Sequence, residues 1–176
     1  QADSDRRVRA ELVRSIQNAA SRLNRLVANL LDMSRLDAGR IKLNLDWCDV
    51  GEVIGVAAQR AEDCLLHRPL TIDVPPDLPL VQMDFVLMEQ VLVNLLDNAC
   101  SYSPAGASIS IEAYIGEGRL LITITDGGKG IPLDDFEHIF DKFYRVPGTA
   151  SGGTGLGLSI CRGLVEAHGG TLVAGN

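Results

Sequence analysis

The chain has 176 residues, of which 46% are apolar, and a net charge of −7 at pH 7. This length suits one globular core with a single appended element, and the acidic balance argues against a nucleic-acid partner, which needs clusters of Lys and Arg. The histidines and cysteines show no zinc-ligand spacing, and the cysteines are expected to be buried, reduced thiols of a cytoplasmic protein. No apolar run reaches the roughly 18–20 residues of a membrane span, so any membrane attachment is expected outside this chain.

Residues 5–38 are predicted to form one long helix, which Gly39 ends. Its apolar positions alternate spacings of four and three, a period of 3.5 that is typical of coiled coils and bundles. These positions are Leu12, Ile16, Ala19, Leu23, Leu26, Leu30 and Met33. The alternative is an amphipathic helix that lies on its own domain. No other segment here is long enough to pair with it, so its partner is expected to be missing from this sequence or to lie in another chain.

From residue 43 onward the pattern predicts an α+β domain with helices on one face of an antiparallel sheet. Helices are predicted from a cap at Asp49 to about His67 and over 85–102, 132–143 and 156–168. Strands are predicted over 70–74, 108–115 and 120–125, and a further strand over 171–174. Residues 146–153 are predicted to be a loop of small residues.

The helix predicted over 85–102 carries a polar stripe opposite its apolar face. Gln90, Asn94, Asn98 and Tyr102 recur every four residues, and residues at this spacing share one helix face. Asn is a poor helix former, so two on one face indicate a polar task. An amide oxygen is a suitable ligand for Mg²⁺ beside nucleotide phosphates. A solvated helix face is the alternative.

Two glycine-rich loops complete a candidate nucleotide site. The first is Asp126-Gly-Gly-Lys-Gly-Ile131, which follows a predicted strand. Its glycines would allow a flat ligand to approach the backbone, and the Asp126 carboxylate can accept a hydrogen bond from the amino group of adenine. The second, Gly153-Thr-Gly-Leu-Gly157-Leu, opens a helix, and the N–H groups at a helix start bind anions. It matches neither a P-loop nor a dinucleotide fingerprint, and either loop alone could be an ordinary turn.

The order and spacing of these segments resemble the nucleotide-binding boxes of sensor histidine kinases. Asn94-Leu-Leu-Asp-Asn98-Ala is similar to the N box of that family, and the two glycine loops are similar to its two glycine boxes. The aromatic residues between Phe136 and Arg145 resemble its F box. Leu30-Leu-Asp-Met-Ser-Arg-Leu resembles the second helix of its dimerisation hairpin, and several stretches are most similar to the potassium-uptake (Kdp-type) branch.

The resemblance implies the two-layer α/β sandwich of histidine kinase, gyrase and chaperone ATPases over residues 43–176. Residues 1–42 would be the second hairpin helix. The implied ligands are ATP and Mg²⁺, with Asn98 coordinating the metal, Asn94 assisting, Tyr102 stacking on adenine and Asp126 binding its amino group. Residues 133–154 would form a lid over the phosphates, toward which Arg145 reaches. The base pocket would be lined by Gly128, Gly130 and Ile131, and the phosphate loop by Gly153, Thr154, Gly155, Leu156 and Gly157.

The activity that the resemblance implies is transfer of the γ-phosphate of ATP to a histidine and then to an aspartate of a response regulator. The intact protein would be a homodimer through its hairpin helices. His67, His138 and His168 all lack the sequence context of the phosphoacceptor. They are expected to be structural or exposed, so the chain alone is expected not to phosphorylate itself. One more strand is expected after Asn176.

Three positions depart from the family pattern. Ser101 stands where a phosphate-contacting Lys is usual, Lys129 where an uncharged residue is usual, and Gly127 where Asn is frequent. Loss of the Lys is expected to weaken triphosphate binding. The alternatives are a related ATPase and a nucleotide-gated dimerisation module without kinase activity. Hydrolytic relatives carry a Glu one turn before the metal-binding Asn, where this chain has Asn94, which cannot act as a base.

Overall fold

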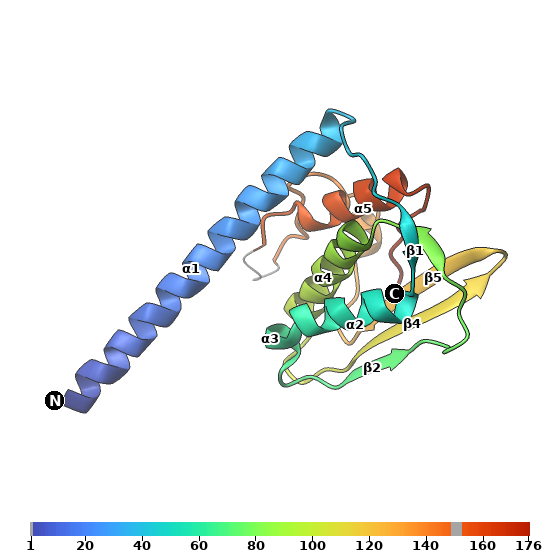
Figure 1. Cartoon of the computed structure of the whole chain (residues 1–176). Coiled ribbons are helices and arrows are strands. Elements are labelled where there is room, and N and C mark those ends of the chain that lie inside the picture. The colour runs from blue at the N-terminus through green and yellow to red at the C-terminus, as the bar shows by residue number, and fades with distance from the viewer. Residues whose placement is uncertain (1, 149–152) are drawn as a thin grey trace.

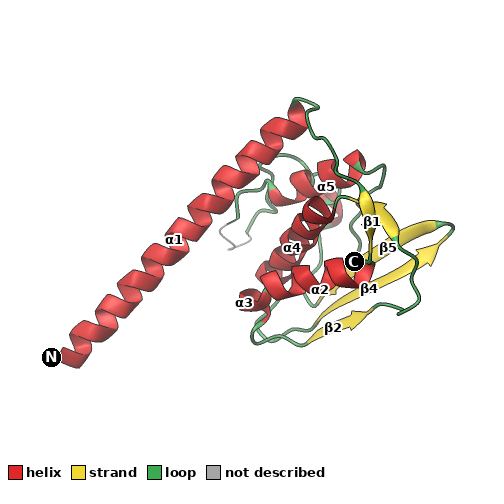
Figure 2. Cartoon of the chain, in the orientation of Figure 1, coloured by secondary structure: helices red, strands yellow, loops and turns green. Residues whose placement is uncertain are grey.

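A long N-terminal helix projects from a domain in which helices lie against one side of a sheet (Figures 1 and 2). The structure is a computed structural model that describes residues 2–148 and 153–176. Helix α1 (Ala2–Asp37) ends before Gly39, which has a φ of 61°, as the sequence predicts. Among the described residues, no helix is long and apolar enough to cross a membrane.

The main sheet has the strand order β2–β4–β5, with β2 at Leu70–Asp73, β4 at Ile109–Gly116 and β5 at Arg119–Asp126. Strands β4 and β5 form the predicted antiparallel hairpin, but β2 pairs with β4 in parallel. The prediction of a wholly antiparallel sheet was therefore wrong. The chain between β2 and β4 includes a long helix, and a crossover of that kind returns the chain in the same direction.

A second, small sheet pairs β1 (Asp46–Cys48) with β3 (Val81–Met83). The sequence did not predict these strands, because three residues are too few to show an alternating pattern.

The helices of the domain are α2 (Val50–Arg60), α3 (Glu62–Leu65), α4 (Phe85–Tyr102) and α5 (Gly157–Ala167). Asp49 caps α2 as predicted, because its side chain accepts a hydrogen bond from the backbone N–H of Glu52 at 3.1 Å. The single helix predicted to reach His67 is broken at Ala61. This residue has φ −88° and ψ 7°, outside the helical range.

Helix α4 is the centre of the core. On one side it packs with α2 and the sheet through fully buried residues such as Ile54, Leu96 and Ile111. On another side, Val91 of α4 packs with α5 through Ile160 and Leu164. Because α4 is packed on two sides, the direction of its polar stripe is set by the core.

Two predicted elements do not form. In place of a helix over 132–143 the chain has only a short 3-10 turn, η1 (Leu133–Asp135), followed by further turns. Phe136, Ile139, Phe140 and Phe143 are spaced like the apolar face of a helix, but Ile139 and Phe140 are buried whereas Phe143 is exposed. Residues 171–174 have no strand partner in the described part of the chain, and an unpaired segment forms no strand. Of the loop predicted over 146–153, residues 149–152 lie outside the described residues.

Candidate functional site

The first glycine loop closes against the last turn of α4. Asp126 ends β5, and its Oδ1 atom accepts a hydrogen bond from the backbone N–H of Gly128 at 2.7 Å. A Cβ atom at Gly128 would lie 2.6 Å from that oxygen and 3.1 Å from the carbonyl oxygen of Tyr102. A side chain there would press against both atoms, so glycine allows this close approach, which brings together Tyr102, Asp126 and Gly128.

Two residues that the sequence analysis did not single out, Ser103 and Arg68, stabilise the corner where the first glycine loop meets the end of α4. The hydroxyl of Ser103 lies 3.0 Å from Asp126 Oδ1. The guanidinium of Arg68 donates to the carbonyl oxygens of Cys100 and Pro104 at 2.7 Å and to that of Ser103 at 3.2 Å. Helix ends leave such carbonyls without partners, and a cation there also suits the helix dipole. Ser103 was interpreted only as the end of a helix, and no local pattern links Arg68 to a site about 30 residues away.

Asn94 and Asn98 are half-buried on α4. The Nδ2 atom of Asn94 is buried without a geometrically acceptable hydrogen-bond partner in the described part of the chain. It faces the thiol of Cys161 on α5, and sulfur is too weak an acceptor to satisfy an amide N–H fully. The buried nitrogen leaves only the amide oxygen of Asn94 as a possible ligand atom.

Cys64 and Cys161 are poorly suited to act as nucleophiles. All four cysteines are free, and Cys48 and Cys161 are buried as expected, whereas Cys64 and Cys100 are only half-buried. Burial raises the pKa of the Cys161 thiol to about 12. Burial, together with the neighbouring Cys100 and Asp97, also raises the pKa of the Cys64 thiol. A thiol with a raised pKa is protonated at neutral pH and therefore poorly reactive.

The second glycine loop joins α5 to the lid segment. Gly155 has a φ of 72°, and its carbonyl oxygen accepts from the backbone N–H of Phe143 at 2.9 Å. A Cβ atom there would lie 2.6 Å from the Phe143 carbonyl carbon, so glycine is required. Thr154 Oγ1 accepts from the backbone N–H of the fully buried Leu156 at 3.3 Å. Added Cβ atoms at Gly153 and Gly157 would meet open space.

At the other edge of the first loop, Gly130 and Ile131 meet the end of the chain. Gly130 has a φ of 76°, and a Cβ atom there would lie 2.7 Å from Asn176 Oδ1. Ile131 exchanges two hydrogen bonds with the Asn176 side chain, at 2.8 and 2.9 Å.

The described part of the predicted lid is folded on itself and tied to α1. Tyr144 donates to the carboxylate of Asp135, which raises the pKa of the tyrosine. His138 pairs with Asp141 at 2.9 Å. Lys142 Nζ lies 2.6 Å from Asp37 Oδ1 at the end of α1. Arg145 is exposed, and its reach toward the phosphates stays a prediction.

His168 has a structural role, as expected. Its Nε2 atom accepts from the backbone N–H of Asp84 at 3.0 Å, and its Nδ1 atom lies 2.7 Å from the carbonyl oxygen of Leu164. These partners require a neutral ring with the proton on Nδ1. His67 and His138 are exposed.

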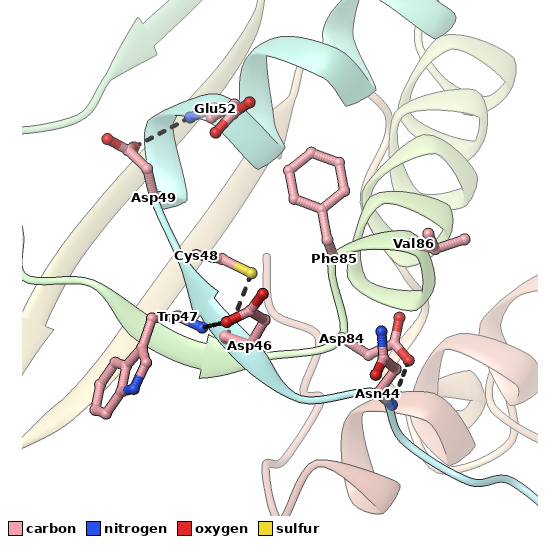
Figure 3. A pocket seen from close by; sticks show the side chains of 9 residues that line it. All are labelled: Asn44, Asp46, Trp47, Cys48, Asp49, Glu52, Asp84, Phe85 and Val86. Carbon is pink, nitrogen blue, oxygen red and sulfur yellow. Dashed lines mark hydrogen bonds between the residues drawn. The ribbon is translucent and has the colours of Figure 1, made fainter.

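A separate cavity of about 270 Å³ lies at the opposite end of α4 from Tyr102 (Figure 3). Three of its four carboxylates already bind the backbone: Asp49 and Asp84 cap α2 and α4, and Asp46 accepts from the N–H of Trp47. Its lining contains no basic side chain. Triphosphate binding there is not expected, because phosphates need cations or free N–H groups.

The chain is similar to known proteins over the segments that form the site. The family model described as "Histidine kinase-, DNA gyrase B-, and HSP90-like ATPase" matches residues 83–176. Sensor protein KdpD of Clostridium acetobutylicum is 39% identical over 98% of this chain and 19% of the relative, and sensor protein KdpD of Escherichia coli K12 is 43% identical over 86% and 17%. The chain thus spans less than a fifth of these relatives. The crystal structure of full-length ShkA in complex with AMPPNP superposes with a TM-score of 0.80 at 26% identity, over 94% of this chain and 35% of that chain.

Proposed function

Because the chain belongs to the histidine kinase-, DNA gyrase B- and HSP90-like ATPase family, we propose that its ATP-binding catalytic domain passes the γ-phosphate of ATP to a histidine within a two-component sensor kinase. The observation that carries the proposal is the closure of the Asp126 loop on the end of α4. That contact brings together the Asp126 carboxylate, a side-chain-free backbone at Gly128 and the backbone carbonyl of Tyr102, the last residue of α4.

This corner suits adenine. Within the described residues both hydrogen bonds of Asp126 use Oδ1, so Oδ2 can accept from the amino group of the base. Tyr102 is 42% exposed and can stack on the ring. Gly128, Gly130 and Ile131 would line the rest of the pocket.

The donor groups present suit Mg²⁺ bound together with a nucleotide. The described residues contain no group of three or more His, Cys, Asp or Glu that could hold a metal by themselves. Mg²⁺ beside nucleotide phosphates needs only one or two protein oxygens, and Asn98 with Asn94 would supply them. The bound ion would neutralise charge on the phosphates during transfer.

Transfer fits this site better than hydrolysis. A hydrolytic enzyme needs a base to activate water, and the amide of Asn94, whose nitrogen is buried against α5, cannot accept a proton. Thr154, Leu156 and the glycines from Gly153 to Gly157 would contact the phosphates through the backbone, with Arg145 approaching from the lid.

The rest of the kinase is assigned by resemblance. Residues 1–42 would be the second hairpin helix and residues 43–176 the catalytic domain. The first hairpin helix would carry the acceptor histidine, and the two helices would form the homodimer. A response regulator would receive the phosphoryl group, and any membrane anchor would belong to other parts of the protein. We infer the Kdp-type branch from the two KdpD relatives.

Calorimetric titration with ATP tests the site. Asn98→Ala should weaken Mg²⁺-dependent ATP binding at least about 10-fold, equivalent to ~1.4 kcal/mol. Asn24→Ala removes an exposed amide from α1 and serves as the matched control. Equal affinities for the two variants would mean that the polar stripe is a solvated face.

Labelling with γ-³²P ATP tests the reaction. The chain alone should bind nucleotide but gain no acid-labile phosphate, whereas a longer protein that includes the preceding helix should become labelled. Binding without labelling of the longer protein would favour the nucleotide-gated module.

A further inference from the structure

We propose that Ser103 is a positioning residue for adenine recognition. Its hydroxyl fixes one carboxylate oxygen of Asp126 so that the other faces the amino group of the base. The inference rests on the proposed role of Asp126 in base binding and adds a residue that determines specificity.

The Ser103 hydroxyl has one proton and two neighbouring acceptors. It lies 2.6 Å from the carbonyl oxygen of Ala99 and 3.0 Å from Asp126 Oδ1. The carbonyl oxygen of Ala99 also accepts a hydrogen bond from the backbone N–H of Ser103, at 3.1 Å. A carbonyl oxygen can accept two hydrogen bonds, so the hydroxyl proton is shared between the Ala99 carbonyl and the Asp126 carboxylate as a three-centre bond. Hydrogen bonds to a charged acceptor are also the stronger ones.

Two donors then hold Asp126 Oδ1 from different elements. One is the Ser103 hydroxyl at the end of α4, and the other is the Gly128 N–H in the glycine loop. Asp126 itself is exposed at the end of β5. Without these donors its carboxylate would rotate, and the nucleotide would have to order it on binding. A carboxylate that is already ordered reduces the conformational entropy lost when the nucleotide binds.

The protein fixes the position of Ser103 independently of any ligand. Its side chain is buried, with 8% of the residue exposed. Arg68 binds the carbonyl oxygens on both sides of this turn, at Cys100 and Pro104, as well as that of Ser103. The chain before β2 therefore braces the turn from which the hydroxyl reaches Asp126.

The test compares two ligands that differ only in the group Asp126 would bind. These are ATP and purine riboside triphosphate, which lacks the amino group. The unmodified chain should bind ATP at least about 10-fold more tightly, because a bound base would cover the Asp126 carboxylate and the analogue would give that carboxylate no hydrogen bond in exchange for water. Ser103→Ala should reduce that ratio about fivefold through weaker ATP binding. Ser103→Thr, which keeps the hydroxyl, should restore it to within about twofold.

The control removes a similar hydroxyl elsewhere. Ser159 Oγ donates to the carbonyl oxygen of Leu156 at 2.9 Å in α5 and does not contact Asp126. Ser159→Ala should keep the full ratio. Should Ser103→Ala fail to fold, Ser103→Cys keeps a side chain of similar size with a weaker donor, and its ratio should fall between those of Ser and Ala.

The outcomes separate the two proposals. If the unmodified chain prefers ATP and Ser103→Ala keeps that preference, positioning by Ser103 is refuted while base binding by Asp126 stands. Equal weakening of both ligands would show a merely structural role and would also refute it. If the unmodified chain binds both ligands equally, the proposed role of Asp126 in base binding is refuted, and the inference about Ser103 is refuted with it. Loss of the preference in Ser103→Ala alone, with rescue by Thr, supports the inference.

Discussion

Helices α1 and α4 have the same kind of amphipathic pattern but opposite surroundings. The apolar face of α4 is buried, and Leu96 is fully inaccessible to solvent. In α1 the apolar seam is open, with exposed fractions of 56% at Leu12, 67% at Ile16 and 60% at Leu23. Periodicity predicts that a segment is helical and which face is apolar, but only a neighbouring element decides whether that face is buried.

The difference in burial between the two apolar faces is confined to part of α1. Its last turns join the domain, where Met33 and Leu36 pack against the cluster around α5 and Asp32 accepts from Gln90 Nε2 at 2.6 Å. The N-terminal part of α1 projects away from the domain (Figure 1). We expect the projecting part to acquire its stability from a partner helix.

The largest expected effect comes from truncating one leucine in each helix. Leu96→Ala should lower the free energy of unfolding by about 2–5 kcal/mol, because it leaves a cavity in a packed core. Leu23→Ala should change it by less than about 0.5 kcal/mol. Urea denaturation of the dilute chain measures both. A large effect of Leu23→Ala that grows with protein concentration would show that the seam is already buried in a dimer.

Two glycine substitutions compare the tight end of α4 with an open helix surface. Gly128→Ala should destabilise the chain by about 1–3 kcal/mol, because the new Cβ atom would lie 2.6 Å from Asp126 Oδ1. Nucleotide binding should weaken with it. Gly55→Ala on α2 meets nothing within 4 Å and should stabilise by about 0.5–1 kcal/mol. Thermal melts with and without ATP check both, and a neutral Gly128→Ala would mean that the loop can move away from the helix.

The ion pair on α4 should contribute more to the free energy of unfolding than the ion pair on α1. Arg60 Nη1 lies 2.7 Å from the Oε1 atom of Glu89, a buried carboxylate on α4, whereas Arg35 and Asp32 on α1 are 3.8 Å apart. Arg60→Ala strands a buried charge and should cost about 1–2 kcal/mol. Arg35→Ala should cost about 0–0.5 kcal/mol. Similar losses for both in urea titrations would contradict the assignment of Glu89 to the packed side of α4.

The smallest effect concerns the exposed segment that is predicted to be a lid. Asp141 accepts a hydrogen bond from His138 and raises the pKa of that histidine above its ordinary value. A raised pKa means that the stability contributed by the protonated histidine is fully present just below the ordinary histidine pKa and is lost as the pH rises through the raised value. An NMR titration of the His138 ring should show this shift, and Asp141→Asn should return the pKa toward the ordinary value. An unshifted pKa in the unmodified chain would mean that this turn of the lid is not ordered in solution.

The sequence was sufficient to predict an element where the residues that begin and end it lie beside it in the chain. Helix α4 covers 85–102 as predicted, because Asp84 caps its start and Ser103-Pro104 ends it. The hairpin of β4 and β5 follows from alternation and a glycine turn. The helix predicted over 132–143 was wrong because Phe136, Ile139, Phe140 and Phe143 are spaced like helix residues, but Ile139 and Phe140 are buried in a series of turns, where Arg162 of α5 lies 3.8 Å from the centre of the Phe140 ring.

The sequence by itself determined the long helix, the polar stripe of α4, both glycine loops and the resemblance that connects them, since each depends on spacing within one segment. Only the tertiary structure decided that β2 runs parallel to β4, that Ser103 lies beside Asp126 and that Arg68 holds their corner. These contacts join residues far apart in the chain. They form because α4 is packed on two sides, which fixes where its last turn meets the end of β5.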